Sequence, residues 1–330
     1  MTPYAAKSVA TAGLAAALAL LPGAAPAQEK FPTRPVEVVA TFGAGGGADL
    51  MARQFARLAE PMLGVALPVV NISGASGNAG LTRVLTNPAD GYTVGTLIAL
   101  SVSSWAAGLG NAKPEDFTYV AVMQNSPSML FVSKDSPIKT FEDFVAATKT
   151  NPGKVRVATS GFGTQDDITI RYLVTQGIKA TNVPFAKPAE RYASTVGRHT
   201  EAIYEEPGDV AQFIKSGDLR PIVVFDEKRH PSFPDVPASA EKGLKISDLP
   251  NFRTLAVPAK TPPERVKVLA DAAQKVLASP EWKNFCTETF TCVEQTYTPE
   301  QAAQMVSQFH TKVKDYLQRF ADEKTATAGR

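Results

Sequence analysis

The chain has 330 residues, a formal net charge of +2 at pH 7 and a hydrophobic fraction of 44%. This length predicts about two domains, and the hydrophobic fraction is ample for ordinary cores. A charge so close to neutral gives no electrostatic basis for binding nucleic acid or an anionic membrane, so neither is an expected partner.

The first 27 residues have the pattern of a secretory signal peptide. Lys7 precedes a run of small and apolar residues over 9–22, and Ala25-Pro26-Ala27 predicts cleavage before Gln28. The alternative, a membrane anchor, needs roughly 18 apolar residues with basic flanks, which this stretch lacks. The sequence therefore predicts an exported protein.

Three strands are predicted in the first part of the chain, over 36–41, 67–70 and 92–98. Each is followed by a loop rich in small residues, over 43–47, 71–77 and 101–104. Helical spacing follows the first two loops. Alternation of strands and helices predicts a parallel α/β sheet.

The same order recurs later in the chain and predicts a second α/β domain. A strand over 155–160 leads through the loop 161–164 into a helix, and further strands are predicted at 202–204 and 221–225. Three helices with proline near their start follow, beginning near residues 262, 280 and 299.

The glycine run Gly43-Ala44-Gly45-Gly46-Gly47-Ala48 resembles a dinucleotide-binding fingerprint. That motif expects an acidic residue about 20 positions on, at the end of the second strand, and this chain has Val70-Asn71 there. Glycine loops at helix N-termini also suit a carboxylate, because the free N–H groups there have a partial positive charge. The loops 43–48, 71–77 and 161–164 share this design, although glycines that only make tight turns remain the alternative.

Catalytic, metal-binding and cofactor motifs are not evident. The three histidines lie in polar surroundings without a nucleophile motif or metal-ligand spacing, and no cofactor is expected. Asp166-Asp167 and Glu205-Glu206 are adjacent in sequence, which does not predict the convergent pair that acid–base chemistry needs. Cys286 and Cys292 leave two readings open, a local disulfide or two small core residues. The sequence therefore predicts a binding protein rather than an enzyme.

Several short segments together are typical of one family. They include Phe31-Pro32-Thr33-Arg34-Pro35, the stretch 42–49, the stretch 71–80, Asn87-Pro88-Ala89-Asp90-Gly91-Tyr92 and Val257-Pro258-Ala259-Lys260-Thr261-Pro262-Pro263. In this order they resemble the Bug-type receptors, the periplasmic substrate-binding proteins of tripartite tricarboxylate transporters. The resemblance implies an α/β, two-lobed periplasmic-binding-protein fold of the Venus flytrap type. It has two crossover strands, near Leu130 and near Thr254. One lobe would comprise 28–130 with 252–330, and the other 131–251.

The resemblance also implies a function and a location. A periplasmic monomer would bind a small carboxylate between its lobes and deliver it to the membrane permease subunits of a tripartite tricarboxylate-type transporter. An exported ligand-binding protein that signals to a sensor kinase is the alternative.

One carboxylate of the ligand would be held by backbone amides of the first lobe, and the second lobe would close over the remainder. The predicted ligand-binding residues of the first lobe are Phe42, Gly43, Ala44, Gly45, Gly46, Gly47, Asp49, Asn71, Gly74, Ser76, Gly77, Ser101 and Ser103. Those of the second lobe are Gly161, Phe162, Gly163, Thr164, Asp167, Phe185 and Glu205.

The second lobe departs from the family pattern at several of these positions. Asp167 stands where the family commonly has a histidine, and Glu205 replaces an aspartate. The expected ligand is a small mono- or dicarboxylate, with citrate-like, dicarboxylic amino-acid, phthalate-like and nicotinate-like compounds all open. Phe162 and Phe185 favour an aromatic ligand if they face the cleft, whereas packing inside the lobe is the alternative.

Overall fold

The structure, a computed structural model, describes residues 1–2, 30–246, 249–291 and 296–328. Nearly all of the predicted signal peptide therefore lies outside the described residues, as does Cys292 of the possible disulfide. The chain divides into the units Met1–Phe31 and Pro32–Arg330, and the second unit contains every helix and strand described below.

The first sheet of this unit has five strands in the order β2-β1-β3-β10-β4. Their bounds are β1 Glu37–Ala40, β2 Val69–Asn71, β3 Thr93–Ile98, β4 Phe117–Ser126 and β10 Asn251–Pro258. β1 is parallel to β2 and β3, whereas β10 is antiparallel to β3 and β4. All six residues of β3 are buried, as expected for a strand covered on both faces.

The second sheet repeats this layout in the order β7-β6-β8-β5-β9. Its strands are β5 Met129–Ser133, β6 Val155–Thr159, β7 Ala180–Pro184, β8 Ala202–Glu205 and β9 Leu219–Val224. β6 is parallel to β7 and β8, and β5 is antiparallel to β8 and β9. The strands predicted from the sequence are confirmed, and the parallel order predicted for the first sheet holds for β1, β2 and β3 but not for β10. One strand in each sheet, β10 or β5, runs against its neighbours.

The chain passes between the sheets twice. It leaves the first sheet after Ser126 and enters the second at Met129; it leaves the second after Val224 and returns at Asn251. We propose that the two sheets are the cores of the two lobes, with boundaries close to those predicted from the sequence.

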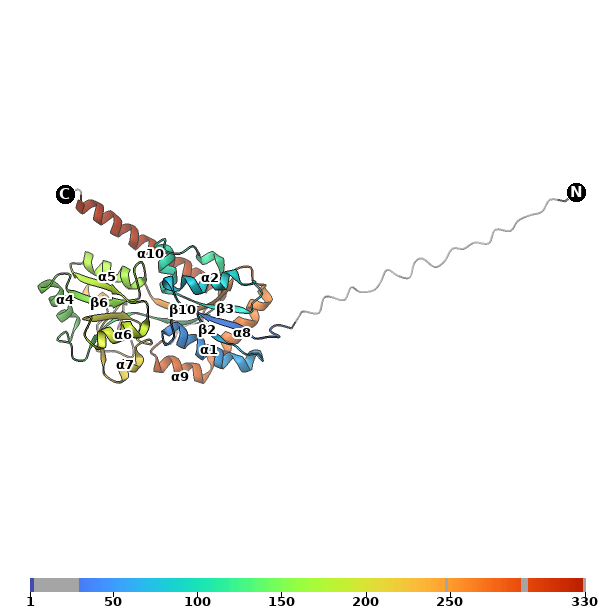
Figure 1. Ribbon diagram of the computed structural model, residues 1–330, viewed down its shortest axis with the longest axis horizontal. Helices are drawn as coiled ribbons and strands as arrows, with labels where there is room; N and C mark the ends of the chain where they lie inside the picture. Colours follow the sequence, from blue (N-terminus) through green and yellow to red (C-terminus); the bar gives the residue numbers. More distant parts are fainter. Residues whose placement is uncertain (3–29, 247–248, 292–295, 329–330) are drawn as a thin grey trace. The chain divides into compact units, whose positions relative to one another are not determined.

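Helices cover both faces of each sheet. The first sheet is covered by α1 Gly47–Leu63, α2 Asn78–Thr86, α3 Ala99–Ala106 and α8 Pro263–Ala278, with α9 Pro280–Glu288 beside α8. The second has α4 Phe141–Thr150, α5 Gln165–Thr175, α6 Pro188–Val196 and α7 Ala211–Lys215. Figure 1 shows α1 and α2 on opposite sides of the first sheet, and α5 and α6 on opposite sides of the second.

The loop predicted over Ser101–Ser104 is instead part of the helix α3, so that prediction is wrong. Every residue of Ala99–Trp105 is buried, and the hydroxyl groups of Ser101 and Ser104 donate to nearby carbonyls. Ser104 Oγ donates to the Ser101 carbonyl at 2.7 Å, and Ser101 Oγ donates to the Ser76 carbonyl at 2.9 Å. Small side chains with such bonds can therefore occupy a buried helix despite their preference for loops.

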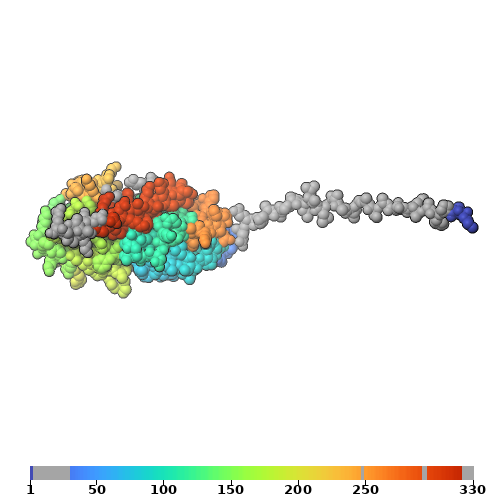
Figure 2. All heavy atoms as spheres, turned by 90° about the horizontal axis from the view of Figure 1, so that it is seen from above, coloured from blue at the N-terminus to red at the C-terminus, as the bar shows by residue number. Residues whose placement is uncertain are grey.

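The last helix, α10 (Pro299–Ala328), contacts elements of both sheets. Phe309 packs edge-on against Phe252 of β10, with ring centroids 5.1 Å apart, and Tyr316 packs edge-on against Tyr172 of α5 at 6.2 Å. In Figure 2 the red atoms of α10 extend from the part of the molecule that holds the first sheet toward the part that holds the second. This helix therefore packs against both halves of the molecule.

We expect Phe309→Ala to lower the free energy of unfolding by about 3–5 kcal/mol, because it removes a buried ring and leaves a cavity. Urea unfolding followed by circular dichroism measures this change. Gln308→Ala, on the exposed face of the same helix, is the control and should change stability by less than about 0.5 kcal/mol. Equal stability of the two variants would contradict the described packing.

Candidate functional site

The carboxyl ends of strands from both sheets meet around one cavity of about 420 Å³. The carboxyl ends of strands in open α/β sheets are the usual place for a ligand. The loops that follow β1, β2, β6, β7 and β8 all contribute to the lining, together with the start of β10. The cavity therefore has walls from both halves of the molecule.

One wall is the N-terminus of α1, with Gly46, Gly47 and Ala48 lining the cavity. The N–H groups of Gly47 and Ala48 have no hydrogen-bond acceptor within the described parts of the chain. A Cβ atom added to Gly47 would overlap the side chains of Asp209 and Arg253, so glycine is required for the backbone to approach so closely. Free amides at the positive end of a 17-residue helix favour an anion there.

The loop over residues 74–77 is the most strained part of the lining. Gly74, Ala75, Ser76 and Gly77 all have positive φ angles, of 134°, 48°, 56° and 86°. For alanine and serine this conformation is unfavourable, and such strain is concentrated at ligand sites. Neighbouring side chains hold it: Ser101 Oγ donates to the Ser76 carbonyl at 2.9 Å, and Asn78 Nδ2 donates to the Ala75 carbonyl.

Asp49, which does not line the cavity, holds the glycine loop after β1 in place. Its carboxylate accepts from the Gly45 N–H at 3.0 Å and from Asn71 Nδ2 at 2.9 Å, and it pairs with Arg53 at 2.9 Å. Burial raises the pKa of Asp49, but the bonds from Gly45, Arg53 and Asn71 outweigh it and lower the pKa below its usual value. Asp49 therefore stays ionised and holds the loop that presents the α1 amides.

Asp167 holds the second-lobe loop in the same way. It accepts from the Gly163 N–H at 2.9 Å and from Asn182 Nδ2 at 2.8 Å, and it pairs with Arg171 at 2.9 Å. The sequence spacing is identical in the two halves: glycine, aspartate four residues later and arginine four residues after that, with an asparagine from the neighbouring strand. The two glycine loops are therefore structural equivalents.

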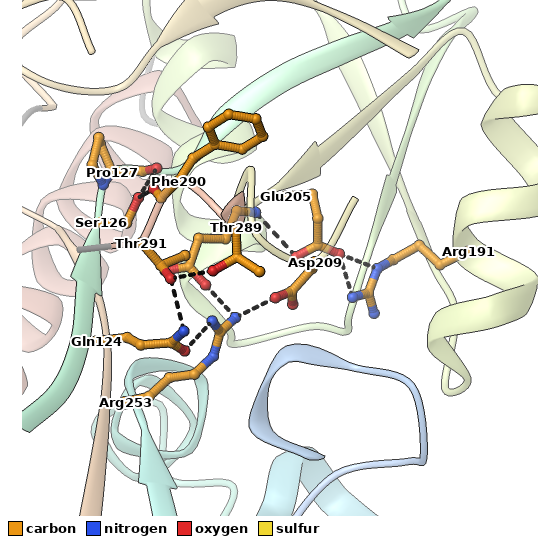
Figure 3. A network of polar contacts seen from close by, with 11 residues as sticks. Gln124, Ser126, Pro127, Arg191, Glu205, Asp209, Arg253, Thr289, Phe290 and Thr291 are labelled. Carbon is orange, nitrogen blue, oxygen red and sulfur yellow. Dashed lines mark hydrogen bonds and ion pairs between the residues drawn. The ribbon is translucent and has the colours of Figure 1, made fainter. Parts of the chain in front are cut away.

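A buried charge cluster of two arginines and four carboxylates borders the cavity: Arg191, Arg253, Glu205 and Asp209 line it, and Asp166 and Glu206 lie behind them. Arg191 Nε donates to Glu205 Oε2 at 3.0 Å. Arg253 pairs with Glu206, donates to Asp209 Oδ1 at 2.7 Å and donates to Gln124 Oε1 at 2.9 Å. Figure 3 shows Arg191 and Arg253 approaching the acidic residues from opposite sides.

Burial is the main cause of the raised pKa of three carboxyl groups in this cluster, Glu205, Glu206 and Asp166. It raises the pKa of Glu205 to about 7, although Arg191 opposes the shift, and it raises the pKa of Glu206 well above its usual value against the effect of Arg253. The pKa of Asp166 is also raised by burial, in spite of Arg191 and the bonds from Ser160. Two guanidinium groups do not neutralise four carboxylates, so the folded protein binds protons here more tightly than the unfolded chain does.

The remaining lining is apolar. Phe42, Ile98 and Leu100 line the first-sheet side, and Phe162 and Phe185 line the second-sheet side. Phe162 is 57% exposed, whereas Phe185 is half-buried and packs against the core cluster of the second sheet. The cavity can therefore bury an aliphatic or aromatic group between its polar ends.

Half of the residues predicted from the sequence line this cavity: Phe42, Gly46, Gly47, Gly74, Ser76, Gly77, Gly161, Phe162, Phe185 and Glu205. The others lie in the same loops or behind them: Gly43, Ala44, Gly45, Asp49, Asn71, Ser101, Ser103, Gly163, Thr164 and Asp167. Asp49, Asn71, Ser101 and Asp167 position the loops through their hydrogen bonds, and Thr164 Oγ1 donates to the Gly161 carbonyl at 2.8 Å. Ser103 is buried in α3. A role of these residues in ligand binding stays a prediction.

Sequence reasoning missed the charged and amide residues of the cavity lining, Arg191, Asp209, Asn251 and Arg253. They come from α6, the segment after β8, and β10, which are far apart in sequence. The repeated spacing of Gly45, Asp49 and Arg53 with Gly163, Asp167 and Arg171 was the signal that could have paired the two loops.

No cluster of three or more His, Cys, Asp or Glu side chains in the described ranges could hold a metal ion. No helix within those ranges is long and apolar enough to cross a membrane.

Known structures place this architecture among the two-lobed periplasmic binding proteins. The chain is similar to periplasmic binding protein BugD, with a TM-score of 0.80 and 24% identity over 88% of this chain and 99% of that one. It is also similar to MatC from Rhodopseudomonas palustris with bound malate, with a TM-score of 0.80 and 26% identity over 87% and 99%. A TctC solute binding protein from Polaromonas has 30% identity and a TM-score of 0.66 over 88% and 100%.

Sequence comparisons identify the family. Residues 51–320 match the tripartite tricarboxylate transporter family receptor, TctC. A UPF0065 protein in the gbd 5′ region of Cupriavidus necator is 32% identical over 83% of this chain and 85% of its own length. Protein BugT of Bordetella pertussis is 28% identical over 82% of each. The chain belongs to the tripartite tricarboxylate transporter receptor family, which confirms the resemblance to Bug-type receptors, and it is a solute-binding protein rather than an enzyme.

The raised pKa of Glu205 makes stability depend on pH. Because the folded-state pKa of about 7 exceeds the usual 4.5, the contribution of this group is complete below pH 4.5 and is lost as pH rises through 7. We expect Glu205→Gln to remove this loss, so that the variant gains on the order of 2 kcal/mol relative to wild type between pH 5 and pH 8. Urea unfolding at each pH measures the difference.

Glu190→Gln is the control, because Glu190 is exposed and pairs only with Lys187. It should follow the wild-type pH curve. A Glu205→Gln curve parallel to wild type over this range would contradict a raised pKa.

Proposed function

We propose that this protein is a periplasmic receptor that captures a small carboxylate in the cavity between its two sheets. As a monomer, it would deliver the ligand to the membrane permease subunits of a tripartite tricarboxylate-type transporter. The observation that carries the proposal is the set of unpartnered N–H groups at the start of α1, beside the strained loop 74–77. Membership of the transporter receptor family supports it, as does the malate bound to MatC.

The first sheet offers a carboxylate site made of backbone N–H groups, without a lysine side chain. A carboxylate at the α1 N-terminus would accept from the Gly47 and Ala48 N–H groups, where the helix contributes roughly half a positive charge. Asp49 keeps these donors in place, since it bonds to Gly45 in the same loop. Preorganised donors lower the cost of binding, because little ordering remains to be done.

The affinity for the ligand should increase when the loops of the first sheet and those of the second contact it together. An added Cβ on Gly46 would lie 3.2 Å from Pro188 Cγ, and one on Gly161 would lie 3.8 Å from Ser76 Oγ, so the opposing loops are already in contact. A ligand that contacts both sides is bound better by this arrangement than by an open one. Its binding therefore shifts the equilibrium toward closure by that difference in affinity.

The ligand itself can be identified directly. We expect protein purified from its periplasm without refolding to release a small carboxylate on denaturation, detected by mass spectrometry. Re-addition of that compound to refolded protein should raise the unfolding midpoint, since a ligand that binds only the folded state stabilises it. Release and rebinding of a compound that lacks any carboxylate would contradict the proposal.

Gly47→Ala tests the position of the carboxylate site. The added methyl group would overlap Asp209 and Arg253, so we expect carboxylate affinity to fall by about tenfold or more. Isothermal titration with the released ligand measures this change. Gly43→Ala is the control, because its Cβ would meet only Pro188 Cδ at 3.4 Å, an ordinary contact. Equal affinity of both variants would contradict binding at the α1 N-terminus.

A further inference from the structure

On the side of the cavity formed by β10 and the segment after β8, two lining side chains have an oxygen that accepts no hydrogen bond from the described residues. Asp166 is satisfied by Ser160, whose N–H and hydroxyl both donate to it. Three carboxylates, Glu205, Glu206 and Asp209, still face the two guanidinium groups of this cluster. Glu205 pairs with Arg191 and Glu206 with Arg253, so Asp209, which shares Arg253, keeps one carboxylate oxygen for a ligand.

Two acceptor atoms at this position have no partner in the described parts of the chain. Asn251 is 4% exposed and lines the cavity, and its Oδ1 accepts no hydrogen bond. Asp209 also lines the cavity with an 8% exposed side chain; its Oδ1 accepts from Arg253, but no hydrogen bond reaches its other oxygen. A buried acceptor without a donor costs about 1–3 kcal/mol. A ligand that supplies donors removes that cost.

Asp209 and Asn251 line the same cavity as the N–H groups at the start of α1, where the carboxylate is proposed to bind. Asn251 and Arg253 are two residues apart on β10 and so face the same side of the sheet, and Arg253 bonds to Asp209. Asp209 in turn contacts Gly47 at the start of α1, because a Cβ there would overlap its carboxylate. Asp209 is therefore a direct neighbour of the α1 amides, and Asn251 lines the same cavity two residues before the arginine that binds Asp209.

We propose that the ligand is an α-amino carboxylate, with its carboxylate on the α1 amides and its ammonium group against Asp209 and Asn251. The inference rests on the proposed carboxylate-binding function. An α-amino acid separates its two charged groups by one carbon, which fits the contact between Gly47 and Asp209. Its ammonium provides three donors and one positive charge, so it can donate to both oxygens, and its bond to the Asp209 carboxylate is charge-assisted.

A hydroxy acid meets these requirements less well. Its hydroxyl group has one donor, which cannot serve both Asp209 and Asn251, and it brings no charge. A metal ion is not favoured by the geometry either, since the described residues contain no cluster of three or more suitable ligands. The rest of the ligand would lie against the apolar side chains, with Phe162 and Phe185 on one side.

Pairs of compounds that differ only in the group on the α-carbon test the inference. We would titrate the full mature chain by calorimetry with L-aspartate and L-malate, L-glutamate and L-2-hydroxyglutarate, and L-phenylalanine and L-phenyllactate. For at least one skeleton, the amino member should bind about tenfold or more tightly than its hydroxy partner, as expected for a charge-assisted bond.

Two variants test whether Asp209 and Asn251 cause the preference for the amino compound. Asp209→Asn removes the negative charge, and Asn251→Leu removes the neutral acceptor without touching an ion pair; each should bring the ratio of amino to hydroxy affinity toward one. Asp218→Asn is the matched control, because Asp218 is at the surface and pairs with Lys134. It should keep the wild-type ratio, and thermal unfolding checks that all three variants are folded.

The outcomes separate this inference from the proposed function. Equal or tighter binding of the hydroxy member in every pair, or binding of no amino member, overturns the inference. An unchanged ratio in folded Asn251→Leu and Asp209→Asn also overturns it. The proposed function survives those results if the compound released from native protein is a carboxylate without an amino group, and it fails if that compound has no carboxylate.

Discussion

The ion pairs of Arg253 join the two sheets next to the cavity, and most of the site is built around them. Arg253 belongs to β10 of the first sheet, whereas Glu206 and Asp209 follow β8 of the second. Removing such charges from water costs several kcal/mol per ion, which is offset only when the partners keep their geometry. The cluster therefore favours one mutual arrangement of the sheets, and that arrangement closes the cavity. Gln124 of β4 supports it by bonding Arg253 at 2.9 Å.

The ligand loops owe their shape to side chains behind them. Asp49 and Asp167 each accept from a glycine N–H four residues earlier and pair with an arginine four residues later. Glycine lets each loop adopt its backbone conformation, and the hydrogen bond to the aspartate fixes that conformation in the folded protein. Because the aspartate satisfies a backbone group inside the loop, the N–H groups at the helix start remain available to a ligand.

The parts of the structure that could be predicted from the sequence are those encoded locally. Strands such as 155–160, glycine loops and helix starts depend on neighbouring residues, and the family resemblance supplied the two-lobed arrangement. The Ser101–Ser104 segment was misread because burial in α3 overrides the loop preference of serine. Asn251 and Arg253 were missed because a residue on β10 meets the second sheet only through tertiary structure. No local pattern marks such a contact.

The cavity combines two opposite kinds of polar surface, and this combination determines what the site can select. The α1 amides attract an anion, which suits any carboxylate and gives little discrimination. Discrimination comes instead from the buried acceptors, because a ligand that cannot donate to Asn251 Oδ1 leaves that atom desolvated and unpaired. Sites of this kind reject the analogue that lacks the donor far more strongly than a hydrophobic pocket rejects a missing methylene. In the proposed site, the α1 amides would therefore capture the carboxylate, and the acceptors of Asn251 and Asp209 would provide the selectivity.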